Sequence, residues 1–106
     1  MKVSASCNDG VMRLYLSGEL DHHGAKEAML YISSRIDISL PRECVLDMGG
    51  VTFMDSSGIA VILKTQRRLS ETGGSFSVEN VSKQAMRVLD ASGISRIVNI
   101  TASIKE

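Results

Sequence analysis

Residues 53–64 read FMDSSGIAVILK: a short apolar segment, three small polar residues, a glycine and then an apolar run. This order is typical of a β-strand that turns directly into an α-helix. Aspartate and serine are both favoured N-cap residues, and each stabilises a helix start by about 1 kcal/mol relative to alanine. Because one cap is enough, a cap at Asp55 leaves the hydroxyls of Ser56 and Ser57 in the first turn without a capping role.

The small residues at this helix start favour a surface role. Gly58 lowers helix stability by about 1 kcal/mol relative to alanine, and we expect it to leave the backbone open to approach from outside. Phosphate suits the position, since the free amides and the dipole of a helix N-terminus favour negative charge. A nucleophilic serine does not fit, because Gly-x-Ser-x-Gly is absent. From residue types alone, a well-capped helix with small residues chosen for turn geometry remains the alternative.

A hairpin and a helix are predicted before this segment. Residues 3–7 and 11–16 read as strands joined by an Asp9-Gly10 turn, which is a strong hairpin signal. After residues 18–21 the apolar period becomes that of a helix, which ends before Pro41. The residues at helical spacing are Ala25, Ala28, Met29, Ile32 and Ile36.

Around the quoted segment we predict a strand and a long helix. Residues 44–48 are nearly all apolar, as in a central parallel strand buried on both faces, and Gly49-Gly50 reads as a turn signal after them. The helix runs from about residue 56 to residue 71, and Gly73-Gly74 gives it a left-handed stop. Its expected buried residues are Ile59, Ile62, Leu63 and Leu69.

The remaining sequence predicts a short strand at 76–78, a helix from a Ser82 cap to Gly93, and a last strand or extended edge at 97–100. Helices that alternate with strands indicate parallel, right-handed crossovers in one sheet. We therefore expect an α/β fold with a small mixed β-sheet and helices packed mainly on one face. Residues 1–106 are the length of one domain.

Composition excludes several classes of function. Twelve basic residues balance twelve acidic ones and aromatic residues make up only 4% of the chain, which disfavours nucleic acid as a partner. The N-terminus lacks the apolar core of a signal peptide, and the longest apolar run, 59–63, is too short to span a membrane. We expect a cytoplasmic monomer that has no membrane partner.

The cysteines and histidines do not suggest a metal site. Cys7 and Cys44 fall in predicted strands without a Cys-x-x-Cys pattern, so we expect two buried free thiols. His22 and His23 are adjacent, and neighbouring residues on a helix point about 100° apart, so they cannot chelate one ion together. Asp21 is the expected cap of the helix that follows, and no metal or cofactor is predicted.

Four motifs resemble the anti-sigma factor antagonists, which are single-domain STAS proteins, and the sporulation member in particular. They are GELDHH at 18–23, VLDMGGVTFMDSSGIAVIL at 45–63, ETGG at 71–74 and DASGI at 90–94, and together they span nearly the whole chain. The MDSSG segment is the specific part of the match. The Gly49-Gly50 pair departs from the family, in which more polar residues are usual.

The resemblance implies a partner-switching regulator of transcription and not an enzyme. Ser56, directly after the motif aspartate, would be phosphorylated by a serine kinase that is also the anti-sigma factor and brings its own ATP and Mg²⁺. The unphosphorylated chain would bind this kinase and release the sigma factor, phosphorylation would abolish binding, and a separate phosphatase would reset the switch. The implied partner-binding residues are Asp21, His22, Met54, Asp55, Ser57 and Gly58.

Two other functions remain open at this point. A STAS domain can be a structural subunit of a lipid-transport or stress-signalling complex. An enzyme or direct nucleotide binder is the third possibility, but the sequence contains no glycine-rich phosphate loop of its own.

Overall fold

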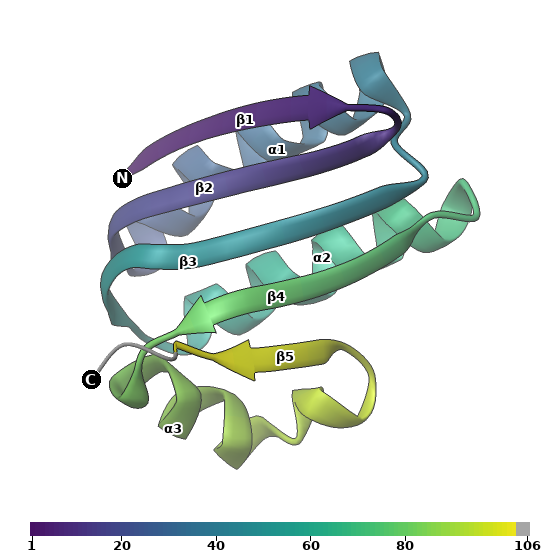
Figure 1. Ribbon diagram of the computed structural model, residues 1–106. Helices are drawn as coiled ribbons and strands as arrows, with labels where there is room; N and C mark the ends of the chain where they lie inside the picture. Colours follow the sequence, from purple (N-terminus) through teal and green to yellow (C-terminus); the bar gives the residue numbers. More distant parts are fainter. Residues whose placement is uncertain (104–106) are drawn as a thin grey trace.

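A computed structural model describes residues 1–103, which form a five-stranded sheet and three α-helices (Figure 1). The strands lie in chain order across the sheet; β1 is antiparallel to β2, and all later neighbours are parallel. This arrangement confirms the predicted α/β fold. The elements are β1 (Lys2–Asn8), β2 (Val11–Leu20), α1 (His22–Ser39), β3 (Glu43–Met54), α2 (Ser56–Glu71), β4 (Ser75–Val81), α3 (Lys83–Ser92), the short 3₁₀ helix η1 (Ile94–Arg96) and β5 (Asn99–Ala102).

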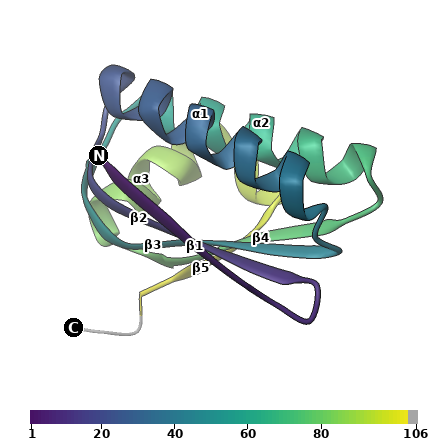
Figure 2. The same ribbon diagram turned by 90° about the horizontal axis from the view of Figure 1, so that it is seen from above.

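All three helices lie on the same side of the sheet (Figure 2). Strand order accounts for this, because right-handed crossovers that always step in one direction return on one face. Val45 is buried and Asp47 is half-buried, as expected for a strand at 44–48 that is buried on both faces, although within residues 1–103 no helix covers the face on which these two side chains lie. Nor does any helix in this part of the chain have the length and apolarity needed to cross a membrane.

The core fills the space between the sheet and the helices. The face of α2 that packs into it differs from the predicted one. Leu63 was expected to be buried but is 37% exposed, whereas Val61 and Thr65 are buried. Ile62 and Leu69 are buried as predicted, but Val61 and Thr65 complete the buried face of α2 in place of Leu63. The Thr65 hydroxyl satisfies its buried oxygen by donating to the Val61 carbonyl at 2.8 Å. The largest fully buried side chains are Met12, Leu14, Leu16, Leu20, Ile32, Ile36, Leu46, Met48, Met54, Ile62, Leu69 and Leu89.

The two cysteines differ in environment. Cys44 is buried in β3, and this burial raises the pKa of its thiol to about 12. Cys7 is exposed, which corrects the expectation of two buried thiols. It lies near the end of the edge strand β1.

Strand β3 continues six residues beyond the predicted end at Met48 and reaches Met54. The Gly49-Gly50 pair is part of the strand and not a turn. A Cβ on Gly50 would lie only 3.0 Å from the Leu16 carbonyl oxygen of β2, so the close approach of the two strands requires glycine. Two register shifts, between Tyr15 and Ser17 and between Gly18 and Glu19, accompany this approach.

The face without helices carries a charged cluster that joins three strands. Arg13 of β2 donates from Nη2 to Asp47 Oδ2 of β3 at 3.0 Å and to Glu79 Oε1 of β4 at 2.7 Å. Burial opposes ionisation of Asp47, but hydrogen bonds from the Gly49 amide, Asn80 and Arg13 outweigh it and hold the pKa of Asp47 below its ordinary value. The ionised carboxylate therefore stabilises the fold.

We expect Asp47→Asn to lower the free energy of unfolding at pH 7, and this deficit to narrow as the pH falls below about 4. A carboxylate whose folded pKa lies below the unfolded value of about 3.9 stabilises the fold above that pH and loses its contribution as pH falls through the folded pKa. Urea unfolding at several pH values measures the difference between the variant and the parent protein. A deficit of equal size at every pH would contradict the prediction.

Candidate functional site

Two helix N-termini lie side by side at one edge of the sheet. Strands β2 and β3 are parallel neighbours and end opposite each other, with Leu20 paired to Met54. Each strand is followed at once by an aspartate and then by a helix, α1 after Asp21 and α2 after Asp55. The Asp55 amide donates to the Leu20 carbonyl at 3.4 Å. We call this pair of helix starts, residues 21–24 and 55–58, the tip.

Both aspartates are N-caps, as the sequence predicted. Asp21 Oδ1 accepts from the Gly24 amide at 2.8 Å, and Asp55 Oδ1 accepts from the Ser57 amide at 2.8 Å. The hydrogen bond from Gly24 holds the pKa of Asp21 below its ordinary value. The tip thus presents two capping carboxylates beside the positive ends of two helix dipoles.

The two serines after Asp55 have different surroundings. Ser56 is exposed, and its hydroxyl has no hydrogen-bond partner within residues 1–103. Ser57 is half-buried, and its backbone amide donates to the capping carboxylate of Asp55. Ser56 therefore offers a free hydroxyl at the surface of the tip. It lies in the first turn of α2, where the backbone amides have no carbonyl partner within the helix.

Two of the residues expected at a partner surface point inward. Gly58 is buried, and a Cβ there would lie 2.6 Å from Met54 Sδ and 3.0 Å from Leu20 Cδ2. The expectation that Gly58 leaves the backbone open to the outside is wrong; its missing side chain makes room for the core. Met54 is fully buried, so its side chain supports the tip from beneath and is closed to direct contact with a partner.

Gln84 of α3 fixes the backbone at the end of β3. Its Oε1 accepts from the Met54 amide at 2.9 Å, and its Nε2 donates to the Met54 carbonyl at 2.8 Å. The pairing of β3 with β4 stops at Asp47, so this side-chain amide takes the place that a neighbouring strand's backbone would otherwise hold. Nothing in the sequence around Gln84 indicates this role. The Ser82 cap predicts only that Gln84 lies in a first helical turn, and no local pattern connects it to Met54.

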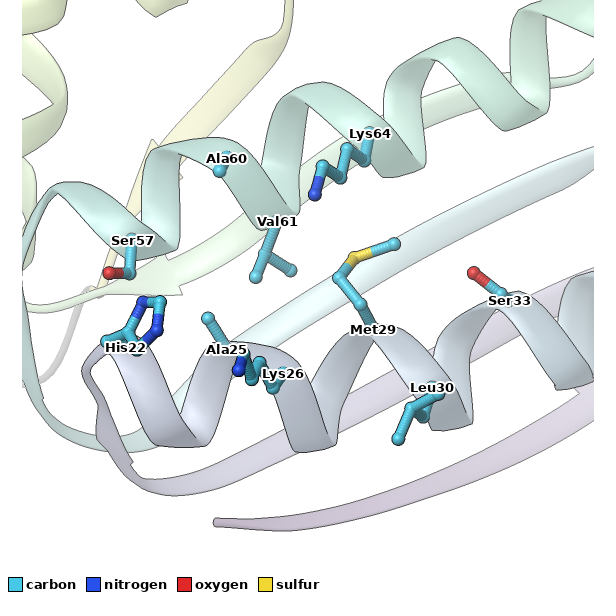
Figure 3. Close-up of a pocket in the computed structure, with 10 residues that line it drawn as sticks. All are labelled: His22, Ala25, Lys26, Met29, Leu30, Ser33, Ser57, Ala60, Val61 and Lys64. Atoms are coloured by element: carbon cyan, nitrogen blue, oxygen red, sulfur yellow. The ribbon is translucent and has the colours of Figure 1, made fainter.

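A groove between α1 and α2 begins at the tip and has a volume of about 660 Å³. Figure 3 shows His22 and Ser57 facing one another at one end of it. Its lining residues are His22, Ala25, Lys26, Met29, Leu30, Ser33, Ser57, Ala60, Val61 and Lys64. Residues 1–103 contain no cluster of three or more His, Cys, Asp or Glu side chains that could hold a metal ion.

Comparisons with known proteins agree on one family. The sequence model of the STAS-domain family matches residues 2–106 of this chain. The anti-sigma F factor antagonist of Paenibacillus polymyxa is 33% identical over 100 residues, covering 94% of this chain and 86% of that protein. The anti-sigma-B factor antagonist of Bacillus subtilis is 28% identical over 106 residues, covering 96% and 92%.

Solved structures give the same result. The unphosphorylated form of the anti-sigma factor antagonist SpoIIAA is 25% identical, with a TM-score of 0.79 and coverage of 93% of this chain and 87% of that one. The phosphorylated form of the Bacillus protein SpoIIAA is 25% identical, with a TM-score of 0.71 and coverage of 93% and 90%. This chain's fold therefore matches both forms.

We expect Gln84→Met to loosen the tip without unfolding the domain. The substitution keeps the length of the side chain but removes both hydrogen bonds to Met54, and a buried polar group left without its partner costs about 1–3 kcal/mol. Amide hydrogen exchange at Met54 and Asp55 should become faster. Gln66→Met is the matched control, since the Gln66 side-chain amide donates to Ser70 of the same helix and, within residues 1–103, has no hydrogen bond to Met54. Equal exchange at these amides in both variants would show that Gln84 does not hold the strand end.

Proposed function

This chain belongs to the STAS-domain family of anti-sigma factor antagonists, and we propose that it is a partner-switching regulator controlled by phosphorylation of Ser56. In its unphosphorylated form it binds an anti-sigma factor kinase, which then releases the sigma factor. Phosphorylation by that kinase ends the binding. The observation that carries the proposal is the free, exposed Ser56 hydroxyl directly after the Asp55 cap.

The geometry favours Ser56 over Ser57 as the acceptor. A kinase must reach the hydroxyl from outside, and Ser56 is exposed whereas Ser57 is half-buried against the α1–α2 groove. A phosphate on Ser56 would lie beside first-turn amides and the positive end of the α2 dipole, which stabilise an anion by about 0.3–1 kcal/mol at an exposed site. The modified chain can therefore keep its fold. The similarity of this fold to SpoIIAA in both forms supports that view.

Phosphorylation then changes partner binding by changing the charge of the surface that the partner covers, not by changing the fold. A phosphate carries a charge of about −1.5 to −2 at pH 7, and it would stand next to the capping carboxylates of Asp55 and Asp21. When a partner excludes water from the tip, this repulsion is screened less and the phosphate must also be desolvated. Both effects weaken binding of the phosphorylated form relative to the free hydroxyl.

Four residues make up the proposed contact surface around Ser56: Asp21, His22, Asp55 and Ser57. Met54 and Gly58 contribute by holding the tip in place, since both are buried. In this scheme ATP and Mg²⁺ belong to the kinase, a separate phosphatase removes the phosphate, and the chain acts as a monomer in the cytoplasm.

Incubation with the cognate anti-sigma factor kinase, ATP and Mg²⁺ should add one phosphate, at Ser56. Ser56→Ala should abolish the modification because it removes the acceptor hydroxyl, while Ser57→Ala should retain it. Intact-mass and peptide mass spectrometry measure both results. A phosphate found on Ser57 or Thr52 would refute the assignment.

Ser56→Asp should bind the same kinase roughly a hundredfold more weakly than the parent chain, a difference of about 2.7 kcal/mol. Ser56→Ala should bind nearly as well as the parent, because it adds no charge. Isothermal titration calorimetry measures the dissociation constants. Ser4→Asp supplies the control, since it adds the same charge on the exposed part of β1 away from the tip. Equal affinities for Ser56→Asp and Ser56→Ala would rule out an electrostatic switch.

A further inference from the structure

The groove between α1 and α2 is a largely apolar surface, and apart from His22 and Ser57 at its end the proposed switch leaves it unused. Small side chains, Ala25 on α1 and Ala60 on α2, leave space between the two helices above Met29 and Val61 (Figure 3). Beyond the groove, toward the C-terminal ends of the helices, Asp37 and Arg68 form an ion pair that joins α1 to α2. The groove therefore occupies the stretch between that ion pair and the tip.

The charged side chains that line the groove are positive. Lys26 lies on the α1 side and Lys64 on the α2 side, and Figure 3 shows the Lys64 side chain extending toward the groove. Among the ten described residues that line the groove, none is an aspartate or glutamate. The whole chain has a formal net charge of +0, so this excess of positive charge is local. An acidic ligand complements it.

Its shape favours a helix over a small molecule. The lining extends from His22 to Ser33 along α1, which is about 16 Å at 1.5 Å per residue, or about three turns of a bound helix. The groove is open along this length, whereas small-molecule sites enclose roughly 70–90% of the ligand surface. Leu30, at the rim, is 77% exposed. Apolar side chains at i, i+3 or i+4, and i+7 of a docked helix would pass between the alanines and reach the floor formed by Met29 and Val61.

Its position connects it to the tip. His22 and Ser57 form the end of the groove. Ser57 directly follows Ser56 in α2, and His22 belongs to the neighbouring helix start of α1. A partner that covers Ser56 therefore already stands at the mouth of the groove. The contact surface can continue from the tip along both helices without a gap.

We propose that the α1–α2 groove docks an amphipathic helix of the anti-sigma factor kinase, with an apolar stripe flanked by aspartate or glutamate. The inference rests on the proposed function, because it takes the kinase as the partner at Ser56. It adds a second contact that anchors the kinase independently of the Ser56 hydroxyl. The lysines attract the acidic flanks, and the floor receives the apolar stripe.

The double variant Lys26→Glu/Lys64→Glu tests the charge complementarity. Its association rate with the cognate kinase should fall about tenfold or more at low salt, and this difference should shrink as salt is raised. The turnover number for Ser56 phosphorylation at saturating chain concentration should stay unchanged, since neither lysine lies at the tip. Lys2→Glu/Arg96→Glu is the control of equal charge, at exposed positions outside the groove. Surface plasmon resonance measures the rates.

A photo-crosslinking residue at position 30 tests the occupant. The same residue at Ile38 serves as the control, because Ile38 is also on α1 and similarly exposed, at 70%, but does not line the groove. Position 30 should crosslink to one acidic, amphipathic segment of the kinase and position 38 should not. Mass spectrometry identifies the captured peptide.

Three results would overturn the inference while leaving the proposed function intact: equal association rates for the two double variants, capture of a kinase segment that is neither helical nor acidic, or capture of a small molecule in place of the kinase. Failure of the unmodified parent chain to bind the kinase would overturn the proposed function, and this inference with it.

Discussion

The parallel pairing of β2 with β3 up to Leu20 and Met54 is the constraint on which the candidate site depends. Because the carboxyl ends of parallel neighbours meet at the same edge, the two helices that follow begin next to each other. An aspartate at the first position after each strand converts this proximity into two capped helix starts. The exposed hydroxyl of Ser56 is a product of that arrangement and needs no dedicated loop.

The tip is supported from two directions. The core holds it from beneath, through Met54 and the close packing against Gly58. Gln84 holds it from the side, through two hydrogen bonds to the backbone of Met54. If Ser56 is phosphorylated as proposed, these contacts let the charge of the surface change while the backbone of the tip stays in place.

Much of the fold and the caps could be predicted from sequence, because they follow from local chemistry. The Asp9-Gly10 turn, the helical spacing in α1 and the caps at Asp21 and Asp55 each have a signal within a few residues. The errors arose where contacts distant in sequence decide the outcome. Gly58 is needed for the side chain of Met54 beneath it, and Gln84 acts on a residue thirty positions earlier.

The two register shifts between β2 and β3 place β3 residues 49–54 opposite a shorter stretch of β2. In a strand, moving the register by one residue turns each side chain to the opposite face. Met48, Val51 and Met54 are all buried although each lies three residues after the last, because each register shift gives β3 one extra residue. In regular pairing, Val51 would lie on the face opposite Met48, so the two shifts are what keep this end of β3 packed against the core and the Asp55 cap beside Asp21. Among relatives with this tip, we expect the number of residues between Asp47 and Asp55 to be constant. We expect insertions at the turn around Gly73 to be tolerated.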